Sequence, residues 1–87
     1  MVREDKLNNA LAALNTVLVI ARSMAYERRT YEEIADVLDV AKYLPRLLAE
    51  PVDQTDHFRG IIADLSAIDQ RFNIAVERFD DPQLGRW

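Results

Sequence analysis

The sequence contains no cysteine, a single histidine (His57), and only two glycines and three prolines in 87 residues. The lack of cysteine excludes disulfides, thiolate metal sites and a cysteine nucleophile. One histidine without cysteine does not supply the ligands of a transition-metal site, so we predict no metal and no cofactor. The shortage of glycine and proline favours a few long helices over many short strands.

Positive charge is also in deficit, because 11 Lys and Arg residues face 15 Asp and Glu residues and the net charge is −4. Nucleic acid is therefore disfavoured as a partner, and no membrane binding is expected. The first six residues place two acids where a secretory signal carries positive charge. No uncharged run is long enough to cross a bilayer. We expect a cytoplasmic protein.

Residue patterns typical of catalysis are missing as well. Ser23 and Ser66 have no histidine at helical spacing, so no nucleophile–base pair is indicated. No Glu-x-x-His pair of the kind found in di-metal helical bundles occurs. We therefore predict no catalytic residues and a protein that is not an enzyme.

The chain does contain a long uncharged stretch near its amino end. The residues from Leu7 to Ala21 carry no charge, although charged residues make up 30% of the sequence. Apolar residues recur there with alternating spacings of four and three, which predicts a helix over about residues 3–26 with this row as its inner seam. The row consists of Leu7, Leu11, Leu14, Leu18, Ala21 and Ala25, and a second row of Ala10, Val17 and Met24 widens it.

The other sides of this helix carry amides and hydroxyls where a solvent-exposed helix would carry Lys and Glu; Asn9 and Ser23 are among them. A helix that avoids charge all round is usually covered all round, by its own chain or by a second copy. Asparagine at a helix–helix contact can also set register and subunit number. We therefore predict a homodimer or higher oligomer; a plain uncharged solvent face is the alternative. The predicted interface comprises Asn8, Leu11, Asn15, Thr16, Val19 and Arg22.

A second helix is predicted over about residues 31–49. Thr30 and Glu33 form a capping box at its start. Pro45 falls inside the apolar pattern, removes one amide donor and disfavours helical angles at Leu44. We expect a kink there, or a break at Tyr43.

A third helix is predicted over about residues 55–80. Phe58, Leu65, Phe72 and Phe79 are each seven residues apart and define one seam. The residues 81–87 would form a tail. The sequence thus predicts one all-α domain over residues 1–87, an antiparallel three-helix bundle that is oligomeric.

The segment Thr30–Ala41 resembles the first helix and turn of bacterial helix-turn-helix domains. The likeness is greatest to region 4 of sigma factors, where a YEEIA-x-x-L run precedes the turn. The resemblance implies DNA binding, with Lys42–Leu48 as the recognition helix. The chain departs from the pattern at Asp39, where the turn usually has glycine, and at Pro45, inside the recognition helix.

Two arginine groupings indicate anion or ligand binding as a further alternative. Arg28 and Arg29 precede the amino end of the second helix, where free amides attract anions. Arg22 and the asparagine row could line a cleft between subunits that takes a small polar ligand such as a nucleotide.

Small size, acidity and the absence of catalytic residues favour a non-catalytic interaction module. We expect it to act by self-association and by binding a protein partner, as an inhibitor, an antitoxin-like protein or a phage-type accessory protein does. A ligand-binding oligomer and a degenerate DNA-binding domain are the alternative functions.

Overall fold

Helices are the only regular secondary structure in residues 1–82, the part of the chain that the computed structural model describes. The predicted all-α class is confirmed, with four helices in place of three. Residues 83–87 of the predicted tail lie outside the described residues. The helices are α1 (Leu7–Tyr26), α2 (Tyr31–Ala49), α3 (Thr55–Asp64) and α4 (Asn73–Asp80), with 3-10 turns at Glu4–Lys6, Leu65–Ala67 and Gln70–Phe72.

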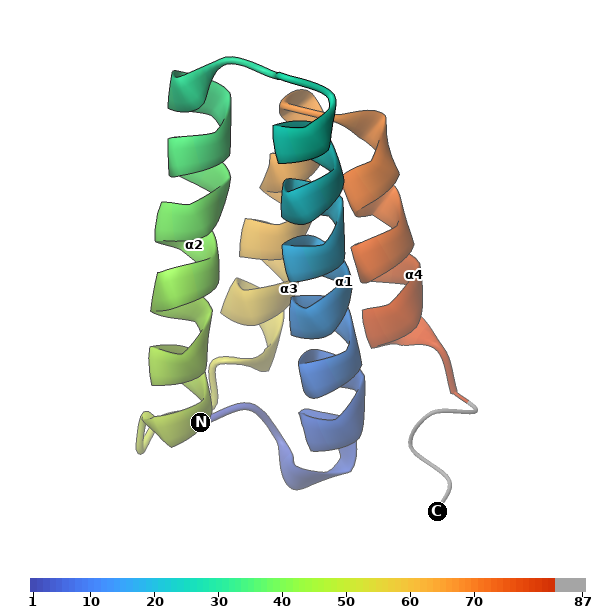
Figure 1. Cartoon of the computed structure of the whole chain (residues 1–87). Coiled ribbons are helices and arrows are strands. Elements are labelled where there is room, and N and C mark those ends of the chain that lie inside the picture. Colours follow the sequence, from blue (N-terminus) through green and yellow to red (C-terminus); the bar gives the residue numbers. More distant parts are fainter. Residues whose placement is uncertain (83–87) are drawn as a thin grey trace.

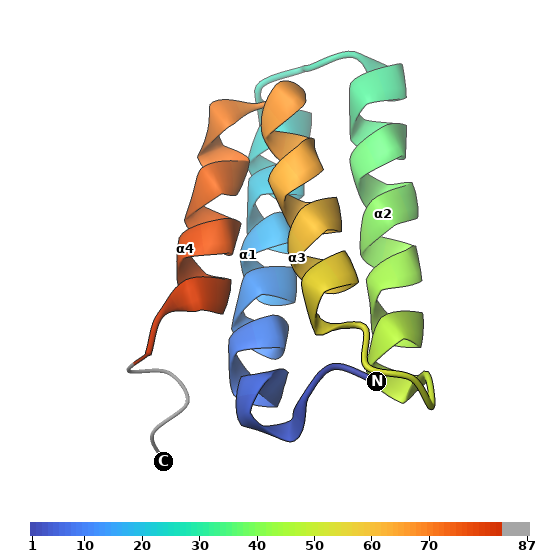
Figure 2. The same cartoon turned by 180° about the vertical axis from the view of Figure 1, so that it is seen from behind.

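The four helices run alternately up and down (Figure 1). In this view α2 and α4 flank α1, and α3 lies behind it; Figure 2 shows α3 from the opposite side. The helix α1 packs mainly against α4 and α2 and less against α3. One side of α1 therefore faces the core, and none of the helices within residues 1–82 covers the opposite side.

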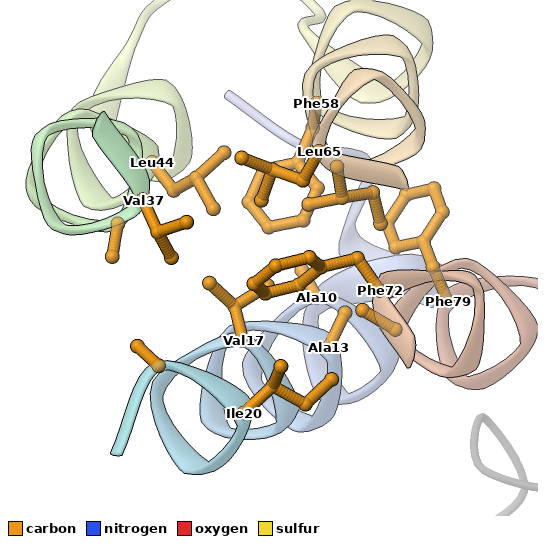
Figure 3. Packing of buried hydrophobic residues seen from close by; sticks show 14 of the residues in the cluster. Ala10, Ala13, Val17, Ile20, Val37, Leu44, Phe58, Leu65, Phe72 and Phe79 are labelled. Atoms are coloured by element: carbon orange, nitrogen blue, oxygen red, sulfur yellow. The ribbon is translucent and has the colours of Figure 1, made fainter. Parts of the chain in front are cut away.

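The core fills the space between the four helices, as Figure 3 shows in a view along them. Its largest fully buried side chains include three phenylalanines, one from α3 and two from the residues around α4. From α1 the core takes mostly small residues, which let the neighbouring helices approach closely. The largest fully buried apolar residues are Phe58, Phe72, Phe79, Met24, Leu44, Leu47 and Ile62.

The prediction of one continuous helix over residues 55–80 is wrong. The chain turns back at Asp69, whose backbone is extended (φ −155°, ψ 129°) and whose carboxylate accepts the Arg71 amide hydrogen at 2.9 Å. The rings of Phe58 and Phe79 stack 5.3 Å apart. In a single helix these residues would be about 31 Å apart. All four seam residues are buried. The seven-residue spacing therefore identified core residues correctly, although the helix that it predicted is not continuous.

The predicted break in the second helix is also wrong, because α2 continues through Pro45 to Ala49. Pro45 is exposed, while Leu44 and Leu47 on either side of it are buried. The helix continues although Pro45 removes one backbone donor, with the buried leucines packed in the core on the inner side. The predicted cap is confirmed, since the Glu33 amide donates to Thr30 Oγ1 at 3.3 Å and the Thr30 hydroxyl donates to Glu33 Oε1 at 2.8 Å.

The first helix ends at Tyr26 as predicted and begins at Leu7, after the 3-10 turn. Its predicted inner side is confirmed in part: the widening row of Ala10, Val17 and Met24 is buried, but the seam leucines are not all buried. Leu11 and Leu18 are 53% and 45% exposed. Leu7 and Leu14 are half-buried against the core, so the buried side is centred on the widening row, where small alanines leave room for neighbouring side chains. The buried apolar residues of this side are Ala10, Ala13, Val17, Ile20, Ala21 and Met24.

Candidate functional site: the outer face of α1

The side of α1 that points away from the core is mostly uncharged. Among its exposed residues, Leu11, Leu18, Val19 and Tyr26 are large and apolar, with exposures of 45–72%. Arg22 is the only charged residue in the helix. We call the exposed residues of α1 the α1 outer face; it comprises Asn8, Leu11, Asn15, Leu18, Val19, Arg22, Ala25 and Tyr26.

The α1 outer face has the spacing of a helix–helix seam. Residues 8, 11, 15, 18, 22 and 25 follow one another at intervals of three and four. Asparagine occupies two positions of one row, and leucine occupies two positions of the other. The spacing is that of a coiled-coil seam, but only one of the two rows is apolar, and the other carries Asn8, Asn15 and Arg22.

The structure brings five of the six predicted interface residues together on this face. The exception is Thr16, which is half-buried at its edge and donates its hydroxyl hydrogen to Ala12 O at 2.9 Å. Leu18, Ala25 and Tyr26 belong to the face but were not predicted for it. The leucine and the alanine were assigned to the core because the heptad pattern does not show which of two adjacent apolar rows faces inward.

Asn9 does not lie on this face, contrary to its predicted outward position. It is 1% exposed, and its Nδ2 donates to the carbonyls of Phe79 (2.9 Å) and Asp81 (2.7 Å), with a longer contact to Arg78 O. Its Oδ1 has no hydrogen-bond partner among the described residues. The side chain satisfies carbonyls at the end of α4 that have no partner within that helix. Asn9 therefore fixes α4 against α1.

The carboxyl-terminal end of the α1 outer face is formed by Arg22 and Tyr26. The guanidinium lies 5.4 Å from the centre of the Tyr26 ring, and Nη2 is 3.4 Å from the phenol oxygen. Both side chains are exposed. This pairing lays the guanidinium along the helix, and a cation that lies over an aromatic face is held there by the ring quadrupole.

A shallow hollow of about 370 Å³ adjoins the α1 outer face on the side of α4. Ile74 and Arg78 of α4 form its far wall, and Ile74 is 43% exposed. The sequence did not indicate these two residues, because the third helix was predicted to be continuous. From α1 the hollow is lined by Ala12, Asn15, Thr16, Val19 and Ile20.

The predicted anion site at Arg28 and Arg29 is not free for an anion at Arg29. Its guanidinium binds the carboxylate of Glu33 in the first turn of α2 (2.5 Å) and that of Asp69 (2.8 Å), and the second pair joins the α1–α2 turn to the α3–α4 turn. Hydrogen bonds from Arg29 lower the pKa of Glu33. Hydrogen bonds from Arg71 and then Arg29 hold the pKa of Asp69 far below its ordinary value. Arg28 is exposed, with φ 59°.

The helix-turn-helix interpretation of Thr30–Ala41 is wrong for this segment. A helix-turn-helix needs a turn near Asp39 and a separate recognition helix after it. In the structure Asp39 lies in the middle of α2, and Lys42–Leu48 continue the same helix. The capped start that carries the likeness is a feature of many helices.

Within residues 1–82, no three His, Asp or Glu side chains are placed to hold a metal ion. None of the helices in this range combines the length and the hydropathy that crossing a membrane requires. Comparisons with protein-family models, curated proteins and solved structures gave no match to this chain. The α1 outer face is therefore the candidate functional site.

Proposed function

We propose that the protein is a non-catalytic helical interaction module that forms a homodimer through the α1 outer face. The observation that supports this proposal is the single charge on that face, in a chain of which 30% of residues are charged. Large apolar side chains at 45–72% exposure gain free energy when a second surface removes them from water. Exposed apolar residues that gather on one face are typical of interaction sites.

The asparagines favour a paired helix over a face in contact with solvent. Asn is a poorer helix former than Lys, Glu or Gln, so a solvated helix gains nothing from Asn8 and Asn15. At a helix–helix contact, the amides can bond to each other and penalise wrong registers. In this proposal the dimer is the unit that binds a further protein, as inhibitors, antitoxin-like proteins and phage-type accessory proteins do.

The test is the mass of the protein in solution over a range of concentrations. We expect sedimentation equilibrium to give twice the 10.0 kDa chain mass at micromolar concentration. The melting temperature should rise with protein concentration. Val19→Glu should give a folded monomer, because it places a charge in the contact. Val52→Glu is the matched control: Val52 is 65% exposed in the α2–α3 turn, and Val19 is 54% exposed.

A wild-type protein that stays monomeric up to about 100 µM, well above the Kd of a specific complex, would overturn the proposal. Equal loss of dimer in Val19→Glu and Val52→Glu would contradict the location of the contact. Circular dichroism distinguishes loss of the dimer from loss of the fold.

The hollow beside the face supports a second candidate function, the binding of a small anionic ligand such as a nucleotide. Arg78 and Asn15 would supply a charged donor and an amide at its rim. If so, a nucleotide should raise the melting temperature of the wild type and of Arg46→Ala, but not of Arg78→Ala. Arg46 is exposed on α2 and serves as the control. No shift with any nucleotide at millimolar concentration would exclude this candidate.

A further inference from the structure

We infer that the two copies pair their α1 helices antiparallel, about a two-fold axis that passes Asn15. This inference rests on the proposed function and adds the orientation and the residue pairs of the contact. Asn15 lies seven residues from both Asn8 and Arg22. A two-fold axis across the helix at Asn15 therefore brings Asn8 level with the partner's Arg22.

Charge distinguishes this arrangement from the parallel one. In a parallel pair, Arg22 would lie level with the partner's Arg22, and two guanidiniums would be desolvated side by side. In the antiparallel pair, Arg22 meets the amide oxygen of the partner's Asn8. The partner's Glu4 and Asp5, both exposed, follow one turn beyond, about 5 Å along the axis.

The helix dipoles favour the same orientation. The partly negative carboxyl end of each α1 lies beside the partly positive amino end of the other. Arg22 is in the last turns of α1, and the acids Glu4 and Asp5 precede its first turn. The antiparallel pair thus places opposite charges together at both ends of the contact.

The two edges of the α1 outer face also match in this arrangement. Leu11 and Leu18 lie on one edge, and Ala12 and Val19 lie on the other, beside the hollow. An axis that crosses the helix keeps each edge against the same edge of the partner. Leu11 then packs on the partner's Leu18, and the partner's Val19 faces the small Ala12 at the hollow. Large residues meet large ones on one edge, and the hollow receives a side chain on the other.

Disulfide trapping tests the orientation directly, because the chain has no native cysteine. Asn8→Cys and Arg22→Cys are made separately, one with a tag that changes its size, and are oxidised with glutathione alone and mixed. In the antiparallel dimer only the mixture should form a disulfide. Its yield should exceed that of either variant alone by about a hundredfold, since the effective concentration in the dimer is millimolar.

Leu11→Cys mixed with Leu18→Cys is a second pair that leaves Arg22 unchanged, and the same result is expected. Val52→Cys is the control that should not cross-link in either case. Each variant is first shown to be dimeric by sedimentation. A dimer in which Asn8→Cys or Arg22→Cys cross-links to itself, or in which neither pair cross-links, overturns the orientation and leaves the dimer standing. A monomeric wild type overturns the proposed function itself.

Discussion

The two long helices α1 and α2 have 20 and 19 residues and bury one side each in the same core, but their outer sides differ. The exposed residues of α1 include one charge, Arg22. The exposed residues of α2 include three acids and two bases, which are Glu32, Asp36, Asp39, Lys42 and Arg46. The difference lies entirely in residues that the core does not use.

This comparison shows that amphipathicity and solvation are separate properties of a helix. The outer side of α2 is typical of a helix in contact with water, because its five charges are interspersed with the exposed Tyr31, Leu38 and Tyr43. The outer side of α1 has the spacing of a second seam. Within residues 1–82, one copy of the chain covers the first seam of α1 and leaves this one exposed, which is why the proposed contact lies on α1.

The largest expected effect is the difference in stability lost when a buried leucine and an exposed leucine are each replaced by alanine. Leu44 of α2 is fully buried, and Leu44→Ala should lower the free energy of unfolding by about 2–5 kcal/mol, because it leaves a cavity. Leu18→Ala should cost less than about 1 kcal/mol in the monomer, because Leu18 is 45% exposed there. Urea unfolding of dilute protein measures both. Equal costs would show that Leu18 belongs to the core.

The next effect concerns the turns that connect these helices to the rest. Asp69 has a 10% exposed side chain and accepts hydrogen bonds from both Arg29 and Arg71. Asp69→Ala should cost about 2 kcal/mol, because two charged donors lose their acceptor. Arg59→Ala is the control, since its bond to Asp80 joins two half-exposed groups and contributes little. A loss no larger than that of the control would contradict the role of Asp69.

The same carboxylate should make stability depend on pH. The two arginines lower the pKa of Asp69 in the folded state, so its contribution is present above the unfolded pKa of about 3.9. That contribution is lost as the pH falls below that value. The urea midpoint should therefore decrease between about pH 5 and pH 3. The decrease should be smaller in Asp69→Asn; an unchanged pH dependence would assign the acid sensitivity to other groups.

A smaller effect is expected at the centre of the α1 outer face. Asn15→Leu should tighten the dimer by about 1 kcal/mol or more, since an apolar side chain replaces a buried amide. It should also admit other registers, because the amide pair no longer selects one. Sedimentation measures the affinity, and the Leu11→Cys and Leu18→Cys pair reports the register. A weaker dimer would show that Asn15 stabilises the contact instead of specifying it.

The smallest effect lies where α1 ends and α2 begins. Arg28 has φ 59° and sits in a turn where the Arg29 amide donates to Met24 O at 3.0 Å. Glycine is favoured at this position, so Arg28→Gly should stabilise the fold by about 0.5–1 kcal/mol. Arg29→Gly should destabilise it, because Arg29 holds Glu33 and Asp69. Loss of stability in Arg28→Gly would indicate that its side chain makes a contact of its own.

Local patterns predicted the elements well. The capping box at Thr30, the end of α1 and the extent of α2 depend on neighbouring residues, and all three were found as expected. The reversal at Asp69 was missed because apolar residues at multiples of seven stay on one side of the chain whether it continues or turns back. Asp69, which caps the 3-10 turn after it, was the available signal.

The sequence predicted most residues of the candidate site, but not the neighbours that α4 supplies. Asn8, Asn15 and Val19 were recognised because an uncharged outer row is rare in a charged sequence. Leu18 was assigned to the core, and Ile74 and Arg78 were not recognised, because their position depends on how α4 packs against α1. The position of Asn9 likewise depends on the carbonyls at the end of α4, which lie 69–72 residues away in the chain.

The sequence by itself determined the helical class, the capped start of α2 and the uncharged character of α1, since periodicity, capping and charge are written in neighbouring residues. Tertiary structure decided which row of α1 faces inward, where the last third of the chain reverses and which arginine is already paired. These outcomes depend on contacts between residues far apart in the chain. For α1, two adjacent apolar rows can compete for the same core. The alanine-rich row faces the core because small side chains leave room for the neighbouring helices, so Leu11 and Leu18 of the adjacent row face outward while Leu7 and Leu14 stay half-buried.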